Sequence, residues 1–168
     1  MQSMQLKPIS KESIPRALDK AERYRLLNEP FLAESICLDV LAVDPVDQRA
    51  LVIYVLALAD QFANGLDGGT KRALDAIQKL TRDYDRSYYA GIVSERRATA
   101  LLERGGYGVS AAAWHHIHEA MASYEKADAL QDDPTNDDAI LRYNTCVRLI
   151  AANRLTEPHA EPDSFPLE

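Results

Sequence analysis

The chain has 168 residues, and its composition, 46% hydrophobic and 27% charged with 7 glycines, is typical of one folded domain and not of a disordered or fibrous protein. It carries 19 Lys and Arg residues against 26 Asp and Glu residues, a net charge of -7. It therefore lacks the large basic field through which proteins bind nucleic acid or anionic membranes. Its longest apolar run, residues 50–59, is too short to span a bilayer.

The cellular location is predicted from the first residues and from the cysteines. Residues 1–12 mix Gln, Lys, Pro and Ser, without the apolar core of a secretion signal. Cys37 and Cys146 are the only cysteines and have no CxxC spacing. This pattern indicates buried free thiols in a reducing compartment, although a single disulfide is also compatible with the sequence. We therefore expect a cytoplasmic protein.

The apolar residues recur with helical periodicity, and no segment shows the alternation of a strand. Seven helices are expected in chain order, over residues 14–28, 30–43, 47–63, a segment beginning at Thr70, 87–105, 109–131 and a segment beginning at Asn136. The third is apolar nearly all round, so it should be the most deeply buried. The stripe expected to pack the seventh helix on the sixth is Ile140, Tyr143, Val147 and Ile150.

Start and stop signals lie at the ends of these helices. Ser13, Thr70 and Asn136 are predicted N-caps, because their side-chain oxygens accept hydrogen bonds from free backbone amides. Asn28 suits a left-handed turn after the first helix. Two glycine-rich segments, residues 64–69 and 105–108, are expected to be loops.

The chain divides into one domain and a tail. Residues 1–155 contain all the expected helices and form the predicted single domain. Residues 156–168 hold four acids and three prolines but no Lys or Arg. Because this composition offers little apolar surface to bury, we expect the tail to be disordered.

A repeated pattern punctuates the chain. Asp44-Pro45 and Asp133-Pro134 each end an Ala-rich helical segment and are followed at once by another helix, as in tandem helical-hairpin repeats. The first hairpin resembles the tetratricopeptide-repeat family at its small, aromatic, apolar and terminating positions, which are Ala21, Tyr24, Ala33, Val40, Leu41 and Pro45. A later hairpin resembles it at Ala120, Tyr124 and Ala127. The resemblance implies an all-α solenoid of three hairpins plus a C-terminal helix.

The sequence also departs from the pattern of that family. The glycine-rich loops lengthen the turns of the second and third hairpins, and the sixth helix begins more than a turn early. The fifth helix, with Gly91 and the charged residues Glu95, Arg96 and Arg97 at its middle, fits no single register. Two interpretations of these charges stay open: Glu95 pairs with an arginine inside the bundle, or the charges form a solvated face with arginine stems over the core.

The family resemblance implies a non-enzymatic protein-protein interaction scaffold that needs no cofactor and binds a peptide or protein in a concave groove. The resemblance also implies that the first helix of each hairpin lines this groove. The groove-facing residues of these helices would be Arg25, Arg49, Val52, Leu56, Arg96, Leu141, Thr145 and Arg148. Guanidinium groups pair with carboxylates while apolar side chains bury an anchor, so the expected partner is an acidic segment with one or two apolar residues.

The tail itself has this acidic character and contains Phe165 and Leu167. It is a candidate occupant of the groove of its own or a neighbouring chain. The alternative is that the tail is inert and the arginines only keep the surface soluble. The seventh helix has no following partner, so a homodimer formed through this end is a further hypothesis.

The alternative function is a small metal- or ligand-binding regulatory domain. His115 and His118 lie one turn apart, with Glu119 four residues after His115, and His116 completes a cluster. The order of these residues does not form the His-Glu-x-x-His motif of zinc proteases, and a partly exposed helix face explains them better than a metal site does. The loop at residues 105–108 lacks the preceding strand and following lysine of a phosphate-binding loop, and no catalytic set of residues is recognised.

Overall fold

The computed structural model describes residues 4–65 and 69–158, and within them the chain is entirely helical, without a strand. The seven helices are α1 (Ile14–Leu26), α2 (Pro30–Val43), α3 (Gln48–Ala59), α4 (Gly69–Ile77), α5 (Asp83–Arg104), α6 (Val109–Leu130) and α7 (Asp138–Asn153). Two short 3-10 turns, η1 (Lys11–Ser13) and η2 (Phe62–Asn64), precede α1 and follow α3. The predicted all-α fold class is confirmed. No helix in this described part of the chain is long and apolar enough to cross a membrane.

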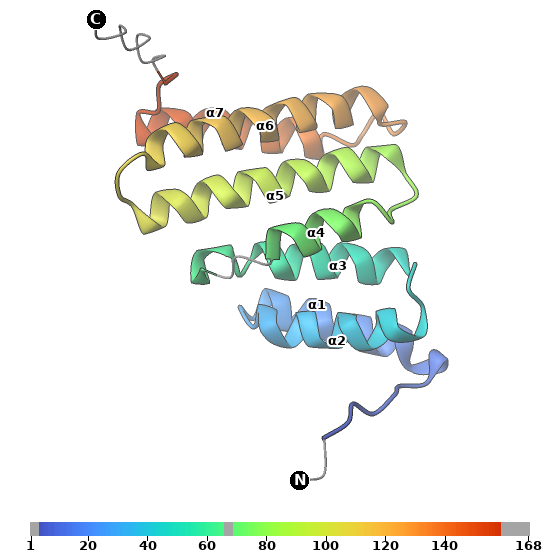
Figure 1. Cartoon of the computed structure of the whole chain (residues 1–168). Helices are drawn as coiled ribbons and strands as arrows, with labels where there is room; N and C mark the ends of the chain where they lie inside the picture. Colours follow the sequence, from blue (N-terminus) through green and yellow to red (C-terminus); the bar gives the residue numbers. More distant parts are fainter. Residues whose placement is uncertain (1–3, 66–68, 159–168) are drawn as a thin grey trace, which may run out of the picture.

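The helices are stacked in chain order, with α1 and α2 at one end of the molecule and α6 and α7 at the other (Figure 1). Each helix packs against the next one along the chain, and α3 also contacts both α1 and α5. The long helices α5 and α6, of 22 residues each, form an antiparallel hairpin with the most extensive interface. The helix α3 lies between neighbours on several sides, as its apolar sequence predicts.

Several helix ends follow the local chemistry that the sequence indicates. Asn28 takes the left-handed conformation after α1, with a φ of 60°. The helix α2 ends at Val43, directly before Asp44-Pro45. Gly105 ends α5 with a φ of 67°, a conformation that a residue with a Cβ rarely adopts.

The three N-cap predictions are right only in part: Ser13 stands at the N-cap of α1, whereas the other two residues do not stand at a helix N-cap. Ser13 makes no capping bond and donates its hydroxyl to the Ser10 carbonyl over 2.8 Å. Thr70 lies inside α4, which begins one residue earlier. Asn136 accepts a hydrogen bond from the Asp138 amide in a turn just before α7. The Ser13 and Asn136 side chains thus bond to nearby backbone in other ways than expected, a choice that Ser and Asn readily make.

The buried residues form two contiguous clusters, one mainly around α1 to α4 and one around α5 to α7. The small residues Ala21, Ala33, Ala120 and Ala127 are all fully buried. Because an alanine adds only one methyl group, these positions let neighbouring helix backbones approach closely. The matches to the repeat pattern therefore lie where the helices pack.

A polar network lies within the second cluster. The Glu95 side chain of α5 is buried, and its carboxylate accepts hydrogen bonds from the Tyr124 hydroxyl at 2.6 Å and from Arg142 Nη1 at 3.1 Å. An added Cβ on Gly91, one turn before Glu95, would lie 2.6 Å from Cε1 of Tyr124. Of the two interpretations of the charged middle of α5, the structure selects a buried pair, formed with an arginine of α7.

The stripe predicted for α7 is right in part, because Tyr143 and Ile150 pack against the second cluster. Ile140 and Val147 are 41% and 46% exposed, whereas Ala139 and Cys146 are buried. The helix is rotated from the expected orientation because Arg142 must reach the buried carboxylate, and an unpaired charge there would be costly. Ile140 and Val147 remain exposed on α7 and are available for a contact with a second copy of the chain. The homodimer stays a prediction.

Overpacking at the small positions provides a test of the stacking. Ala33→Leu should lower the free energy of unfolding by about 1 to 3 kcal/mol, because the buried site has no room for three more carbons. Urea denaturation measures the change. The control Ala122→Leu, at an exposed position of α6, should change stability by less than about 0.5 kcal/mol. Equal effects of the two substitutions would contradict the packing described.

Gly91→Ala tests the close approach of α5 and α6. In a helix this substitution usually stabilises by about 0.5 to 1 kcal/mol, since glycine has the more flexible unfolded chain. Here the new methyl group meets the Tyr124 ring, so we expect a loss of about 1 to 3 kcal/mol in urea denaturation. A double-mutant cycle with Tyr124→Leu should remove most of that penalty. A stabilised Gly91→Ala variant would disprove the contact.

Candidate functional site

The eight predicted groove residues belong to α1, α3, α5 and α7, and the structure separates them into groups. Arg25 and Arg96 converge on Asp60, the residue after α3. Arg25 Nε lies 2.8 Å from Asp60 Oδ2 in an ion pair whose geometry is not that of a hydrogen bond, and Arg96 Nη2 lies 3.7 Å from Asp60 Oδ1. The carboxylate thus joins α1 to α5 across the end of α3.

These residues line a hollow of about 350 Å³, which we call the Asp60 hollow. Its other lining residues include Leu26 and Thr99, and Glu103 contributes a second carboxylate. The Nε atoms of Arg25 and Arg96 are buried and have no hydrogen-bond partner among the described residues. Because 3.7 Å is too long for a hydrogen bond, the Arg96 guanidinium retains donors that Asp60 does not use.

Arg49 of α3 does not reach the Asp60 hollow and is bound instead by two acids of α1. Its Nη2 donates to Asp19 Oδ1 and to Glu22 Oε2 of α1, each over 2.8 Å. These hydrogen bonds raise the pKa of the guanidinium, so it stays charged. Two carboxylates on one arginine leave this part of the face acidic, which weakens its attraction for an acidic ligand.

The predicted apolar anchors divide in the same way. Val52 and Leu56 are partly buried against the two core clusters. Leu141 is 61% exposed and lines a smaller hollow of about 230 Å³ with Tyr88, Arg142 and Thr145. Arg148 is exposed on α7. The predicted groove residues therefore differ in how accessible their side chains are, and the sequence did not predict this difference.

Of the residues that line the Asp60 hollow, only Arg25 and Arg96 were predicted as site residues from the sequence. Asp60 directly follows ten apolar residues at the end of α3, and this abrupt change to a charge was its only signal. The periodicity of α1 predicts that either Leu26 or Leu27 joins its packing stripe, yet Leu26 is 76% exposed and lines the hollow. Both positions depend on how helices distant in sequence approach one another.

The three histidines of α6 do not converge on one site, because each has a different environment. His116 Nδ1 lies 2.9 Å from Glu119 Oε2, and the His118 ring stacks on Trp114 with 3.6 Å between centroids. His115 is exposed. Among residues 4–65 and 69–158, no three His, Cys, Asp or Glu side chains are grouped so that they could hold a metal ion.

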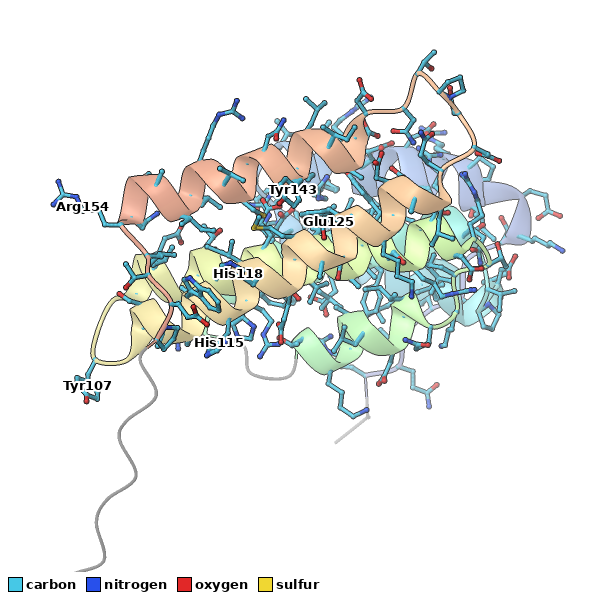
Figure 2. The ribbon with its side chains drawn as sticks, turned by 90° about the horizontal axis from the view of Figure 1, so that it is seen from above. Tyr107, His115, His118, Glu125, Tyr143 and Arg154 are labelled. Atoms are coloured by element: carbon cyan, nitrogen blue, oxygen red, sulfur yellow. The ribbon has the colours of Figure 1, made fainter. Side chains whose placement is uncertain are left out.

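A further hollow of about 310 Å³ lies between α6 and α7 at the end of the stack. Figure 2 shows Glu125 of α6 and Tyr143 of α7 in the space between these helices. Ile140 and Asp128 also line it. This hollow is apolar with an acidic edge, in contrast to the arginine-containing Asp60 hollow.

Both cysteines are buried free thiols in this structure, as predicted. Burial is the largest cause that raises the pKa of Cys37 to about 12 and that of Cys146 to about 12. Glu34 and Asp47 add to the shift at Cys37, and Glu95 adds to it at Cys146. Because the thiolate is the reactive form, these thiols are poor nucleophiles at neutral pH.

Comparison with known proteins found no match to a protein family, to a curated protein or to a solved structure.

The thiol pKa values predict how stability depends on pH. The unfolded thiols have a pKa near 9.0 and the folded ones near 12, so the folded state binds more protons between these values. Stability is therefore fully present below pH 9 and should fall as the pH rises toward 12. Burial also raises the pKa of Tyr89 to about 12, which adds to the loss above pH 10.

The variant Cys37→Ala/Cys146→Ala separates the contribution of the thiols. It should show a shallower fall of unfolding free energy with pH, by up to about 1.4 kcal/mol per pH unit for each thiol removed. Urea denaturation at several pH values measures the slope of the unfolding free energy against pH. The smaller alanine side chains lower the unfolding free energy by the same amount at every pH, so they do not change this slope. Equal slopes in variant and wild type would mean that the thiols are not buried as described.

Proposed function

We propose that the chain is a non-enzymatic interaction scaffold, a tetratricopeptide-like solenoid that binds a peptide or protein segment along the face shared by α1, α3, α5 and α7. The contacts of α3 with α1 and α5, together with the packing of every helix on the next, support this architecture because stacked antiparallel hairpins produce the same set of neighbours. The proposed location is the cytoplasm.

The Asp60 hollow carries the proposal. It is built from three different helices, so it exists only in the stacked fold, and it combines an arginine with spare hydrogen-bond donors and an exposed leucine. The Arg96 side chain is 37% exposed. A carboxylate of a bound segment can therefore pair with Arg96 while an apolar side chain of the same segment covers Leu26.

The partner is accordingly an acidic segment with an apolar anchor. Asp60 and Glu103 oppose a ligand that carries only negative charge, so its acid must lie close to Arg96 and its apolar residue must contribute much of the binding. The proposed occupancy of this face by the tail of the chain concerns residues 156–168, of which 159–168 lie outside the described residues.

Selection of peptides from a random displayed library on the purified full-length protein tests this function. We expect enrichment of Asp or Glu next to Leu or Phe, and Arg96→Glu should weaken binding of a selected peptide by about tenfold or more, because a charge-assisted hydrogen bond is replaced by repulsion. Fluorescence anisotropy with the synthetic peptide gives the affinities.

The matched control is Arg23→Glu, which makes the same change at an exposed position of α1. It should leave the affinity of the peptide within a factor of about two, since its long-range charge effect is screened at physiological salt. Selected peptides without acids, or equal losses in the two variants, would refute the proposed binding face.

A further inference from the structure

A second hollow, of about 390 Å³, lies beside the C-terminal half of α5 and has a different charge from the Asp60 hollow. Arg97, Leu101 and Arg104 are four and three residues apart, so they share one face of α5. His116 of α6 lines the hollow opposite this face, and Thr70, in the first turn of α4, completes its polar lining. We call this site the Arg97 hollow.

The Arg97 hollow gathers cationic side chains. None of its lining residues within the described part of the chain is Asp or Glu. Elsewhere in the described part of the chain, seven arginines form ion pairs with acids. They are Arg25, Arg49, Arg72, Arg82, Arg86, Arg96 and Arg142. In a chain with a net charge of -7, two arginines that face a concave site and form no ion pair with a described residue are unexpected.

The acid that contacts His116 does not line the hollow. Glu119 Oε2 lies 2.9 Å from His116 Nδ1, but Glu119 is 58% exposed and does not line the hollow. The contact holds the imidazole in place beside the hollow. The hollow thus offers two guanidinium groups, an imidazole and the Thr70 hydroxyl to an anion.

We propose that the Arg97 hollow binds a phosphate group in its dianionic form. Guanidinium forks match the oxygens of phosphate bidentately, and two of them balance two negative charges, whereas a single carboxylate would leave one guanidinium unpaired. The positive end of the dipole of α4 adds to this attraction next to Thr70. The volume lies within the range of small-molecule sites.

This site is distinct from the proposed peptide-binding face. Arg96 and Arg97 are adjacent in sequence but point into different hollows, so either site can be removed by substitution without touching the other. Phosphate binding therefore stands or falls independently of the scaffold function.

Titration calorimetry with the full chain tests the proposal at constant ionic strength. The probes are inorganic phosphate, pyrophosphate and a short peptide that contains one phosphoserine, each compared with chloride. We expect saturable binding at millimolar concentration or below, and a loss of about tenfold or more in both Arg97→Gln and Arg104→Gln. Tighter binding of pyrophosphate identifies a small phosphorylated molecule as the source, and tighter binding of the peptide identifies a phosphorylated protein.

Arg23→Gln is the control variant and should bind the probes as the wild type does, because it lies outside the hollow on α1. Circular dichroism checks that each variant is folded. If Arg97→Gln does not fold, Arg97→Lys keeps the charge and the apolar stem but loses the bidentate fork, and it should still weaken binding several-fold. The absence of saturable binding of every probe, or equal affinities in wild type and both hollow variants, would overturn the proposal.

Discussion

The buried Glu95 carboxylate fixes the arrangement of the C-terminal half of the molecule. It receives the hydroxyl of Tyr124 from α6 and the guanidinium of Arg142 from α7, so one side chain of α5 ties three helices together. A charge at this depth is tolerated only when its partners are in place, and the absence of a side chain at Gly91 lets the Tyr124 ring approach. The rotation of α7 and the closeness of α5 and α6 both follow from this requirement.

The same interaction determines how α5 presents its arginines. Because successive residues of a helix are about 100° apart, an inward Glu95 turns Arg96 and Arg97 outward in two different directions. Arg96 faces α1 and the end of α3, where Asp60 partly balances it, and Arg97 faces α4 and α6, together with His116. Two neighbouring surfaces with different charge balance therefore arise from one buried contact.

The N-terminal half contains a comparable buried glutamate. Glu34 of α2 is buried, accepts a hydrogen bond from Gln61 Nε2 at 2.7 Å, and is paired with Arg72 of α4. Gln61 also donates to the Ala57 carbonyl, which anchors it at the end of α3. In both halves a buried glutamate links helices that are not adjacent in sequence, so the stacking is specified by polar contacts as well as by apolar burial.

The sequence by itself determined the features that depend on neighbouring residues: the helices and their approximate bounds, the left-handed turn at Asn28, and small packing positions such as Ala33. Of the residues that line the Asp60 hollow, it predicted Arg25 and Arg96, but neither Asp60 nor the exposure of Leu26. Periodicity is a local property, whereas the partner of a charge depends on residues far apart in the chain. Only the tertiary structure therefore decided which arginines are neutralised, how α7 is rotated and where the hollows lie, because these are set by contacts between helices.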